Sequence, residues 1–268
     1  MKIIAFKSGL GNQIFCYLLC EYFRDKGEEV YYYSNNKYLR QHNGLEINRF
    51  FQIDFPSSPW YVKLISNNVR IFCRFFPSLK TNDANYRDDA LYYDGNFQDK
   101  RFFNDNIKKI KFQIPVLSVE NTDVIKKIKD RYAVSLHVRR GDYLDPVRIE
   151  KYGKACGIEY YEKALGVVES RAESPLMVVF SDDIPWVKEN IKALSEFDCV
   201  FVDWNKGEDS YLDMYLMSLC DASIIANSTF SYWGAMLGKK KDVVIRPKVW
   251  IGEWVPDIFP EEWVAIKP

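Results

Sequence analysis

Residues 132–143 read YAVSLHVRRGDY, and this stretch decides the expected fold class. Its first part, Tyr132–Leu136, has the length and apolar composition of a buried strand. The strand leads into two adjacent arginines and Gly141, a residue that permits a tight turn. A helical pattern follows over Ile158–Arg171. A buried strand, a polar loop and a helix in this order are typical of a βαβ unit in a parallel sheet.

The same order recurs through the second half of the chain. The further strands expected there are Leu176–Phe180, Cys199–Val202, Ala222–Ala226 and Val243–Ile245. The helices expected between and after them are Asp183–Ile191, Asp209–Cys220 and Asn227–Leu237, and Thr122–Arg131 precedes the first strand. This alternation predicts a parallel α/β domain over residues 121–268.

The first part of the chain predicts a smaller α/β domain over residues 1–120. Lys2–Phe6 and Val30–Tyr33 have the pattern of strands, and Asn12–Lys26 has the apolar spacing of a helix. Further helices are expected at Trp60–Phe76 and Asp99–Phe112, whereas the rest of residues 34–115 has little regular pattern. We therefore expect two Rossmann-type domains, each with a parallel sheet.

Composition excludes several classes of protein. Among 268 residues, 37 are basic and 37 acidic, so no net positive charge is available to hold nucleic acid. An aromatic content of 16% excludes a disordered chain. The sequence has neither a secretory leader nor a long apolar run, and its six cysteines form no C-x-x-C pair, so we expect a cytoplasmic protein with reduced thiols.

The residues 137–143 (HVRRGDY) form the strongest chemical motif. Two adjacent guanidinium groups at a strand end can bind phosphate oxygens through paired hydrogen bonds and stabilise a diphosphate leaving group. The alternative is an Arg–Asp cluster that only fixes a loop. The chain contains no Asp-x-Asp triplet, and its two histidines argue against a zinc site, so we expect diphosphate binding without a metal ion.

Three other polar motifs follow expected strands. In Ser181–Asp183, Ser181 or Asp182 can cap a helix, and a carboxylate there can instead accept hydrogen bonds from a nucleoside. Asn227–Ser231 (NSTFS) opens a helix, whose first N–H groups attract phosphate, although it can serve simply as an N-cap. Gly9–Gln13 (GLGNQ) permits close approach of a ligand, but it lacks the third glycine of a dinucleotide fingerprint.

These four motifs together resemble glycosyltransferase family 11, the bacterial α-1,2-fucosyltransferases. The resemblance rests on Gly9–Gln13, His137–Tyr143, Ser181–Asp183 with Trp186, and Asn227–Ser231, and it extends from residue 8 to about residue 237. Ser8, Cys16 and Tyr232 depart from the residues common in the family. The resemblance implies a GT-B-like fold in which the two sheets face a central cleft, with an acceptor-side N-terminal domain and a donor-binding C-terminal domain.

The resemblance also implies the reaction. GDP-β-L-fucose would be the donor, no metal would be needed, and fucose would pass with inversion to O2 of a terminal galactose on a surface polysaccharide or other glycan. Arg139 would bind the β-phosphate, and Asn12 would face the reacting sugar with Gly11 and Gln13. The remaining donor-binding positions would be His137, Arg140, Gly141, Asp182, Asp183, Asn227, Ser228, Thr229 and Ser231.

The residue that removes the acceptor proton is left open by the sequence. Asp142, Glu46 and His137 are candidate bases, and Asp142 can instead pair with an arginine, which would lower its pKa. A dissociative path that needs little base is a further alternative. A basic and aromatic segment has two interpretations, contact with the inner membrane or an ordinary amphipathic packing helix. Its residues are Lys63, Arg70, Arg74, Lys80, Phe72, Phe75 and Phe76.

A fucosyltransferase of another linkage, or a transferase of another GDP-sugar, is the nearest alternative. Two further alternatives belong to other classes of protein. An NAD-linked oxidoreductase would use Gly9–Gln13, but the missing glycine argues against it. A non-catalytic glycan-binding module would use the abundant tryptophan and tyrosine residues, but it leaves the phosphate-binding features unexplained.

Overall fold

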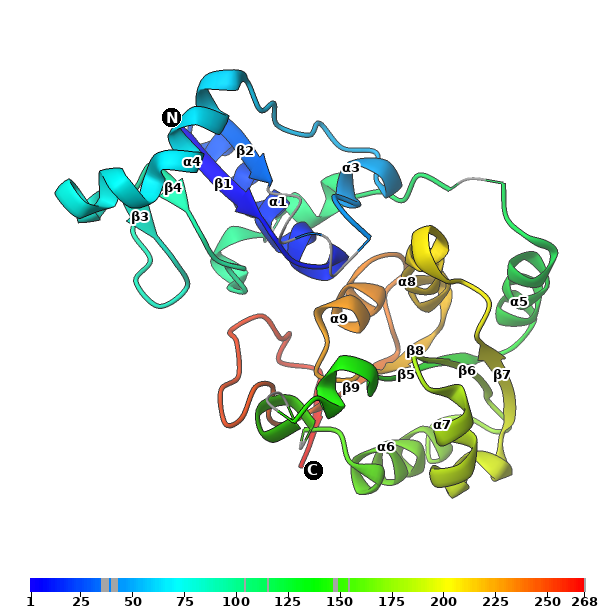
Figure 1. Ribbon diagram of the computed structural model, residues 1–268. Helices are drawn as coiled ribbons and strands as arrows, with labels where there is room; N and C mark the ends of the chain where they lie inside the picture. The colour runs from blue at the N-terminus through cyan, green and yellow to red at the C-terminus, as the bar shows by residue number, and fades with distance from the viewer. Residues whose placement is uncertain are drawn as a thin grey trace. The chain divides into compact units, whose positions relative to one another are not determined.

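The computed structural model describes residues 1–34, 39, 43–103, 105–114, 116–146, 149–153 and 155–267. The chain divides into two compact units, Met1–Gln113 and Ile114–Pro268. This division lies close to the boundary expected at residue 120. Each unit is built around a parallel sheet (Figure 1).

The N-terminal unit has a parallel sheet in the order β2-β1-β4-β3. Its strands are β1 (Lys2–Phe6), β2 (Val30–Ser34), β3 (Lys80–Thr81) and β4 (Tyr92–Tyr93). Its helices are α1 (Leu10–Asp25), α3 (Ile47–Phe50) and α4 (Trp60–Phe75). The central strand β1 is buried along its whole length, because helices cover both faces of the sheet.

The two faces of β1 follow the alternation of its side chains. Ile3 and Ala5 pack against Val62 and Val69 of α4. Lys2 points to the opposite face, where its amine lies 5.1 Å from the ring centre of Phe23 in α1. Burial of these apolar groups is the main stabilisation of the unit.

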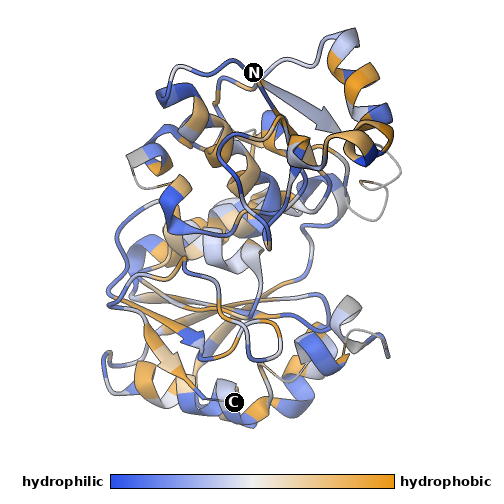
Figure 2. Ribbon diagram, turned by 90° about the vertical axis from the view of Figure 1, so that its left-hand side faces the viewer, coloured by the Kyte–Doolittle hydropathy of each residue, from blue (hydrophilic) through white to orange (hydrophobic). Residues whose placement is uncertain are grey.

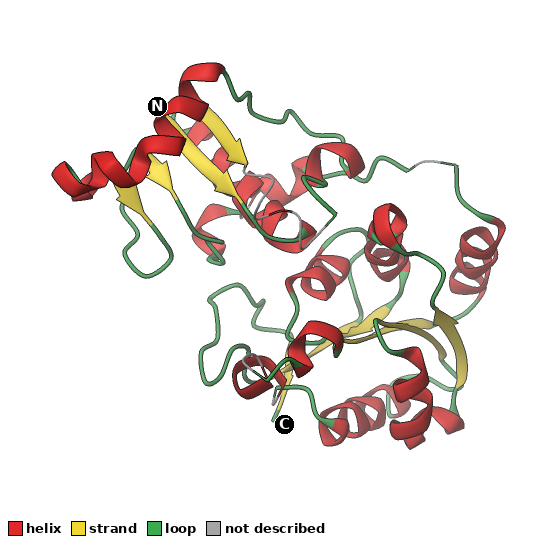
Figure 3. Ribbon diagram, viewed as in Figure 1, coloured by secondary structure: helices red, strands yellow, loops and turns green. Residues whose placement is uncertain are grey.

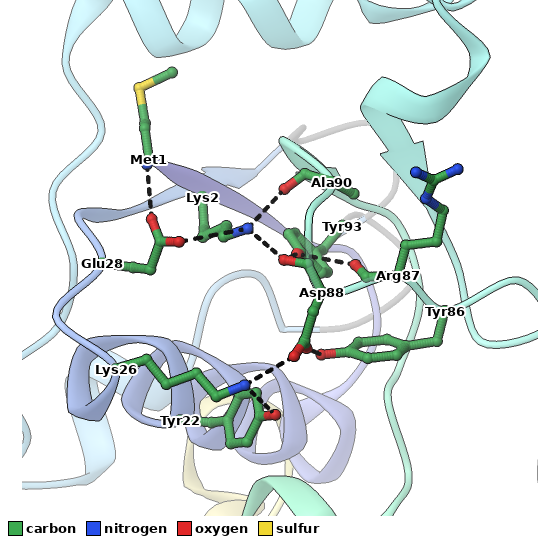
Figure 4. Close-up of polar contacts among 10 residues, drawn as sticks. All are labelled: Met1, Lys2, Tyr22, Lys26, Glu28, Tyr86, Arg87, Asp88, Ala90 and Tyr93. Carbon is green, nitrogen blue, oxygen red and sulfur yellow. Dashed lines mark hydrogen bonds and ion pairs between the residues drawn. The ribbon is translucent and has the colours of Figure 1, made fainter.

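Polar contacts hold the loop before β4 beside the amino-terminal end of β1 (Figure 4). The buried amine of Lys2 donates to the carbonyl oxygens of Asp88 and Ala90. The carboxylate of Asp88 accepts from Lys26 at 2.8 Å and from the hydroxyl of Tyr86. The loop before β4 is therefore fixed to both β1 and α1.

The expected helix at Asp99–Phe112 is wrong. The structure has two short 3-10 helices there, Lys100–Phe102 and Asp105–Lys109. The rings of Phe102 and Phe103 both contact α1, through Tyr22 and Phe15 respectively. Consecutive residues of an α-helix point about 100° apart, so two adjacent rings that pack on one helix favour a less regular backbone.

The described part of the C-terminal unit contains a six-stranded parallel sheet in the order β10-β9-β8-β5-β6-β7. Its strands are β5 (Ala133–Val138), β6 (Leu176–Ser181), β7 (Asp198–Val202), β8 (Ala222–Ile224), β9 (Val243–Pro247) and β10 (Val264–Ile266). Its helices are α5 (Val119–Asp130), α6 (Ile158–Glu169), α7 (Ile184–Asn190), α8 (Tyr211–Leu219) and α9 (Thr229–Met236). In chain order the strands have the 3-2-1-4-5-6 arrangement of a Rossmann sheet.

Helices cover both faces of this sheet (Figure 3). Val134 and Leu136 of β5 face the helices α6 and α7, whereas Ala133 faces α5 and α8. The strands are hydrophobic along most of their length, as expected when both faces are buried (Figure 2). The α/β class and the two parallel-sheet units of a GT-B-like fold are confirmed, while a cleft between the two sheets stays a prediction.

A helix needs about 20 mostly apolar residues to cross a lipid bilayer. Among the described residues, no helix is both long enough and apolar enough to do so.

The contact between α8 and α9 yields a test of the fold. A Cβ atom built on Gly234 of α9 would lie 2.8 Å from the Cβ and Sδ atoms of Met217 in α8. We expect Gly234→Ala to lower the free energy of unfolding by ~1–2 kcal/mol in denaturant titrations, because the two helices must separate or Met217 must move.

Gly166 supplies the matched control. It lies in α6, where an added Cβ atom would meet nothing within 4 Å. Gly166→Ala should leave stability unchanged or raise it by up to ~1 kcal/mol. Equal effects of the two substitutions would contradict the close α8–α9 contact.

Candidate functional site

The C-terminal sheet places two polar motifs on adjacent strands. β5 pairs with β8, and Leu136 lies opposite Ile224. After β5 the next strands lie toward one edge of the sheet, and after β8 they lie toward the other edge. His137 and Val138 are the last residues of β5, Arg139–Tyr143 follow it, and Asn227–Ser231 lie beyond the carboxyl end of β8. Open α/β sheets bind ligands at this point, because loops to the two sides diverge and leave a crevice.

The two motifs are in direct contact. The hydroxyl of Tyr143 donates to the carbonyl oxygen of Asn227 at 2.9 Å. The rings of His137 and Phe230 lie 6.1 Å apart. Residues far apart in the sequence are therefore brought to one place, as the expected site requires.

Two ion pairs join the arginines to the motif that follows β6. The guanidinium of Arg139 lies 3.0 Å from Asp182, which also accepts the backbone N–H of Arg140 at 2.9 Å. The Nε of Arg140 lies 3.3 Å from Asp183. The Arg–Asp cluster expected as an alternative is thus present, and each arginine has a defined orientation.

Arg140 is also held by an aromatic ring. Its guanidinium carbon lies 3.6 Å from the ring centre of Trp186 in α7, a stacked cation–π contact. The side chain of Arg139 remains 36% exposed. A fixed pair of guanidinium groups, one of them open to solvent, can bind a diphosphate through its planar N–H groups.

Gly141 is required by this arrangement. A Cβ atom at Gly141 would lie 2.8 Å from Oδ2 of Asp182, the carboxylate that orients Arg139. Any larger residue would push that carboxylate away. Gly141 therefore allows Asp182 to stay within reach of Arg139.

His137 is a buried, neutral side chain. Only 7% of its surface is exposed, and burial, helped by the positive charge of Arg139, lowers its pKa to about 4. Its Nδ1 is among the buried polar atoms that lack a hydrogen-bond partner in the described part of the chain. The imidazole can therefore offer a hydrogen bond to a ligand but is a weak acceptor of a proton.

The loop after β8 is held by its own polar side chains. The amide of Asn227 donates to the carbonyl oxygens of Tyr152 and Trp250 at 3.1 and 2.9 Å. Ser231 donates to the carbonyl of Ser228 at 3.2 Å. These two residues position the loop, and their polar hydrogens are already engaged.

Ser228, Thr229 and Asp183 lie at helix starts. Ser228 caps α9 by accepting the N–H of Phe230, and Thr229 is the first residue of that helix and is half-buried. Asp183 caps α7 by accepting the N–H of Trp186 at 3.1 Å. The N-cap alternative is confirmed for the loop after β8, at Ser228. For α7 the expected cap, Ser181 or Asp182, is wrong, because the helix begins one residue later and Asp183 caps it. Nucleotide binding by Ser228, Thr229 and Asp183 stays a prediction.

Gln13 in the N-terminal unit supports a loop. Its amide donates to the carbonyls of Ser8 and Gly44, each at 2.9 Å, and accepts the N–H groups of Glu46 and Ile47. These bonds use both donor and both acceptor positions of the amide, so none is left for a sugar. Direct sugar binding by Gln13 would require one of these bonds to break.

Asn12 and Gly11 lie beside Gln13 at the start of α1. Gly11 is buried, whereas Asn12 is half-buried and its Oδ1 accepts from Gln98 at 3.0 Å. Their expected contact with the reacting sugar depends on how the two units are placed and stays a prediction.

The candidate bases differ in their surroundings. Glu46 is buried, which raises its pKa, and it accepts hydrogen bonds from Asn43 at 3.3 Å and from the backbone of Leu10, the first residue of α1. This carboxylate therefore stabilises the start of α1. The side chain of Asp142 lies outside the described residues. His137, with its low pKa, is poorly suited to remove a proton at neutral pH.

A metal site requires several ligating side chains that converge on one point. Within the described residues, no group of three or more His, Cys, Asp or Glu side chains is placed to hold a metal ion.

Two buried tyrosines support the site and were not expected. Tyr160 of α6 donates to the carbonyl of Ile225 at 2.6 Å, and Tyr161 donates to that of His137 at 3.3 Å. The signal in the sequence was their position on the apolar face of α6, since a buried tyrosine hydroxyl needs a partner. They connect α6 to both strands that carry the site.

Comparison with known proteins places this chain in a family. The family model "Glycosyl transferase family 11" matches residues 79–267, more than half of the chain. The O-antigen biosynthesis glycosyltransferase WbnK of Escherichia coli is 33% identical over 53% of this chain and 48% of that protein. The alpha-1,2-colitosyltransferase of Escherichia coli is 29% identical over 97% of this chain and 96% of that protein.

A third relative comes from a primate. The galactoside alpha-(1,2)-fucosyltransferase 1 of Ateles belzebuth is 34% identical over 41% of this chain and 30% of that protein. The chain thus matches about half of WbnK and less than a third of the primate enzyme, but nearly all of the colitosyltransferase.

The buried state of His137 predicts a pH-dependent stability. Its pKa of about 4 in the folded protein lies below the usual 6.5, so the unfolded chain binds a proton first as the pH falls. The free energy of unfolding should be highest above about pH 6.5 and fall by ~2 kcal/mol through this group near pH 5.

Denaturant titrations of the wild type and of His137→Gln at neutral and acidic pH measure this contribution. The variant keeps a polar side chain but cannot titrate in this range, so its stability should decline less with acidification. An equal decline in both proteins would contradict a buried neutral imidazole.

Proposed function

The chain belongs to glycosyltransferase family 11 and is a glycosyltransferase, and from this premise we propose that it transfers L-fucose from GDP-β-L-fucose to O2 of a terminal galactose. In this proposal the anomeric configuration is inverted, no metal is needed, and the reaction takes place in the cytoplasm at the inner face of the membrane. The matching primate protein is named as a galactoside alpha-(1,2)-fucosyltransferase, which supports the linkage and the acceptor.

The observation that carries this proposal is the pair of oriented arginines at the end of β5. Arg139 and Arg140 are held in place by Asp182, Asp183 and Trp186. A leaving GDP gains negative charge on its β-phosphate as the bond to the sugar breaks, and preorganised guanidinium groups stabilise that charge without reorganisation.

Inversion determines which bond breaks and on which face of the sugar the new bond forms. The bond between the anomeric carbon and the β-phosphate oxygen breaks, and GDP keeps the electron pair. The galactose O2 forms a bond to the opposite face of the anomeric carbon and loses its proton. Arg139 would bind the departing phosphate, and the neutral imidazole of His137 would add a hydrogen bond from its unpartnered Nδ1 side.

The proton of O2 has no assigned acceptor. Glu46 is engaged with the start of α1, and the pKa of His137 is too low for an effective base. Asp142 stays a candidate base, since only Glu46 and His137 are poorly suited. We favour a dissociative path, in which the sugar carries much positive charge before O2 attacks and the O2 proton passes late to Asp142 or to solvent water.

Transfer of colitose is a second candidate, favoured by the match to a colitosyltransferase over 97% of this chain. Colitose is fucose without its 3-hydroxyl group, so the two donors share the GDP that the arginines would bind. A pocket with a hydrogen-bonding group for that hydroxyl would reject colitose strongly, whereas an apolar one would discriminate weakly.

Substitutions of Arg139 test whether this residue stabilises the leaving GDP. We expect Arg139→Ala to lower kcat with GDP-fucose and a galactoside by about a hundredfold or more, since a lost charge-assisted contact to the transition state is worth several kcal/mol. Arg139→Lys should recover little, because an ammonium group lacks the planar fork.

Arg131 is the matched control. It also pairs with an aspartate, Asp198, but at the amino end of the C-terminal sheet. Arg131→Ala should leave transfer nearly unchanged. Wild-type turnover by Arg139→Ala would refute the proposed role.

Product analysis tests the donor and the metal requirement. Wild-type protein incubated with GDP-fucose or GDP-colitose and a panel of galactosides should form an α-1,2-linked product, and transfer should persist in excess EDTA. Faster transfer from GDP-colitose would favour the second candidate. Loss of activity in EDTA that Mg²⁺ or Mn²⁺ restores would overturn the metal-free mechanism.

A further inference from the structure

Helix α4 of the N-terminal unit presents three different stripes of side chains along its length. One stripe faces its own sheet. Val62, Ser66 and Val69 are buried there, and Ile65 and Cys73 pack beside them against the core of the unit. Their spacing of three or four residues is that of one helix face. The attachment of α4 to the protein is thus already provided by this stripe.

A second stripe, on the side away from the sheet, is apolar and exposed. Trp60 is 76% exposed, Leu64 57%, Ile71 54% and Phe75 74%. Their spacings of four, seven and four residues place them in one row. Phe72 and Phe76 add further exposed aromatic surface near the end of the helix. Asn67 and Asn68 lie between Leu64 and Ile71, so the row consists of two exposed apolar clusters, one toward each end of the helix. Clusters of large exposed apolar side chains mark an interaction site.

A third stripe is basic and runs beside the apolar one. Lys63, Arg70 and Arg74 are all exposed, and their spacings of seven and four residues align them along the helix. The sequence between Asp54 and Asp83 contains no acidic residue. The surface therefore combines large apolar side chains with positive charge of a single sign.

We propose that this exposed face of α4 is a docking surface for an anionic lipid bilayer. The helix would lie in the plane of the interface, with Trp60 and Phe75 inserted among the acyl chains near its two ends. The row between them spans about 22 Å at 1.5 Å per residue. The stripe of Lys63, Arg70 and Arg74 would contact lipid headgroups, whose negative charge attracts juxtamembrane cations.

The charge pattern favours a bilayer over a second copy of the chain. In a symmetric dimer that pairs the two helices antiparallel, the basic stripe of one copy lies against that of the other, so the three cations would face three cations. No carboxylate within residues 55–82 could neutralise them. An anionic bilayer satisfies both the apolar and the basic stripe.

Vesicle co-sedimentation of the full chain tests this surface directly. Vesicles of phosphatidylglycerol with phosphatidylcholine are compared with vesicles of phosphatidylcholine alone, without donor or acceptor. We expect at least about tenfold tighter binding to the anionic vesicles, and weaker binding at high salt. Arg70→Glu/Arg74→Glu and Trp60→Ser/Phe75→Ser should each lower that binding by about tenfold or more.

Matched controls lie on exposed positions of the C-terminal unit. Lys127→Glu/Lys129→Glu on α5 makes the same charge change, and Trp254→Ser removes another exposed aromatic. Both should bind vesicles as the wild type does. Circular dichroism melts verify the fold, and transfer to a soluble galactoside should be unaltered in the α4 variants, so the membrane and the transfer proposals can fail separately.

Three outcomes would overturn the proposal. The first is equal binding to both kinds of vesicle, and the second is wild-type vesicle binding by both α4 double variants. The third is a dimer in sedimentation velocity that the α4 substitutions convert to a monomer, without vesicle binding by the wild type. That last result would assign the surface to a second copy of the chain.

Discussion

The candidate site depends on keeping two adjacent positive charges at the end of one strand. Arg139 and Arg140 follow β5 directly, and their mutual repulsion is offset by Asp182 and Asp183, which follow the neighbouring β6. Trp186 fixes the second arginine by stacking. Because the two strands are parallel neighbours, their carboxyl ends necessarily bring the two motifs together. The order of strands in the sheet therefore brings together the arginines and aspartates of the candidate site.

Burial then decides what the neighbouring groups can do. His137 is forced into its neutral form by desolvation and by Arg139, which suits it to hydrogen bonding rather than to proton transfer. Asn227 and Ser231 use their hydrogen bonds to hold the loop after β8, and Gln13 holds the loop before α3 through Gly44 and Glu46. The candidate site thus consists of two arginines and a larger set of residues that position the surrounding loops.

Periodicity predicted the fold most successfully where strands are long and flanked by polar loops, as for β5 and β6. It missed β4, because a buried strand of two residues, Tyr92 and Tyr93, has no period to detect. The sequence also located the arginine motif and its aspartates, but not their ion pairs. The difference between a capping and a ligand-binding serine, as at Ser228, depends on tertiary contacts that local sequence does not encode.

Hydrogen–deuterium exchange with and without GDP tests the central claim most directly, because it reports which backbone segments a nucleotide covers. The account predicts that GDP slows exchange in residues 138–143 and 226–231 together, with no comparable change at the amino ends of β5 and β8. Protection confined to residues 8–13, or none in the two segments after β5 and β8, would contradict a diphosphate site at this edge of the sheet.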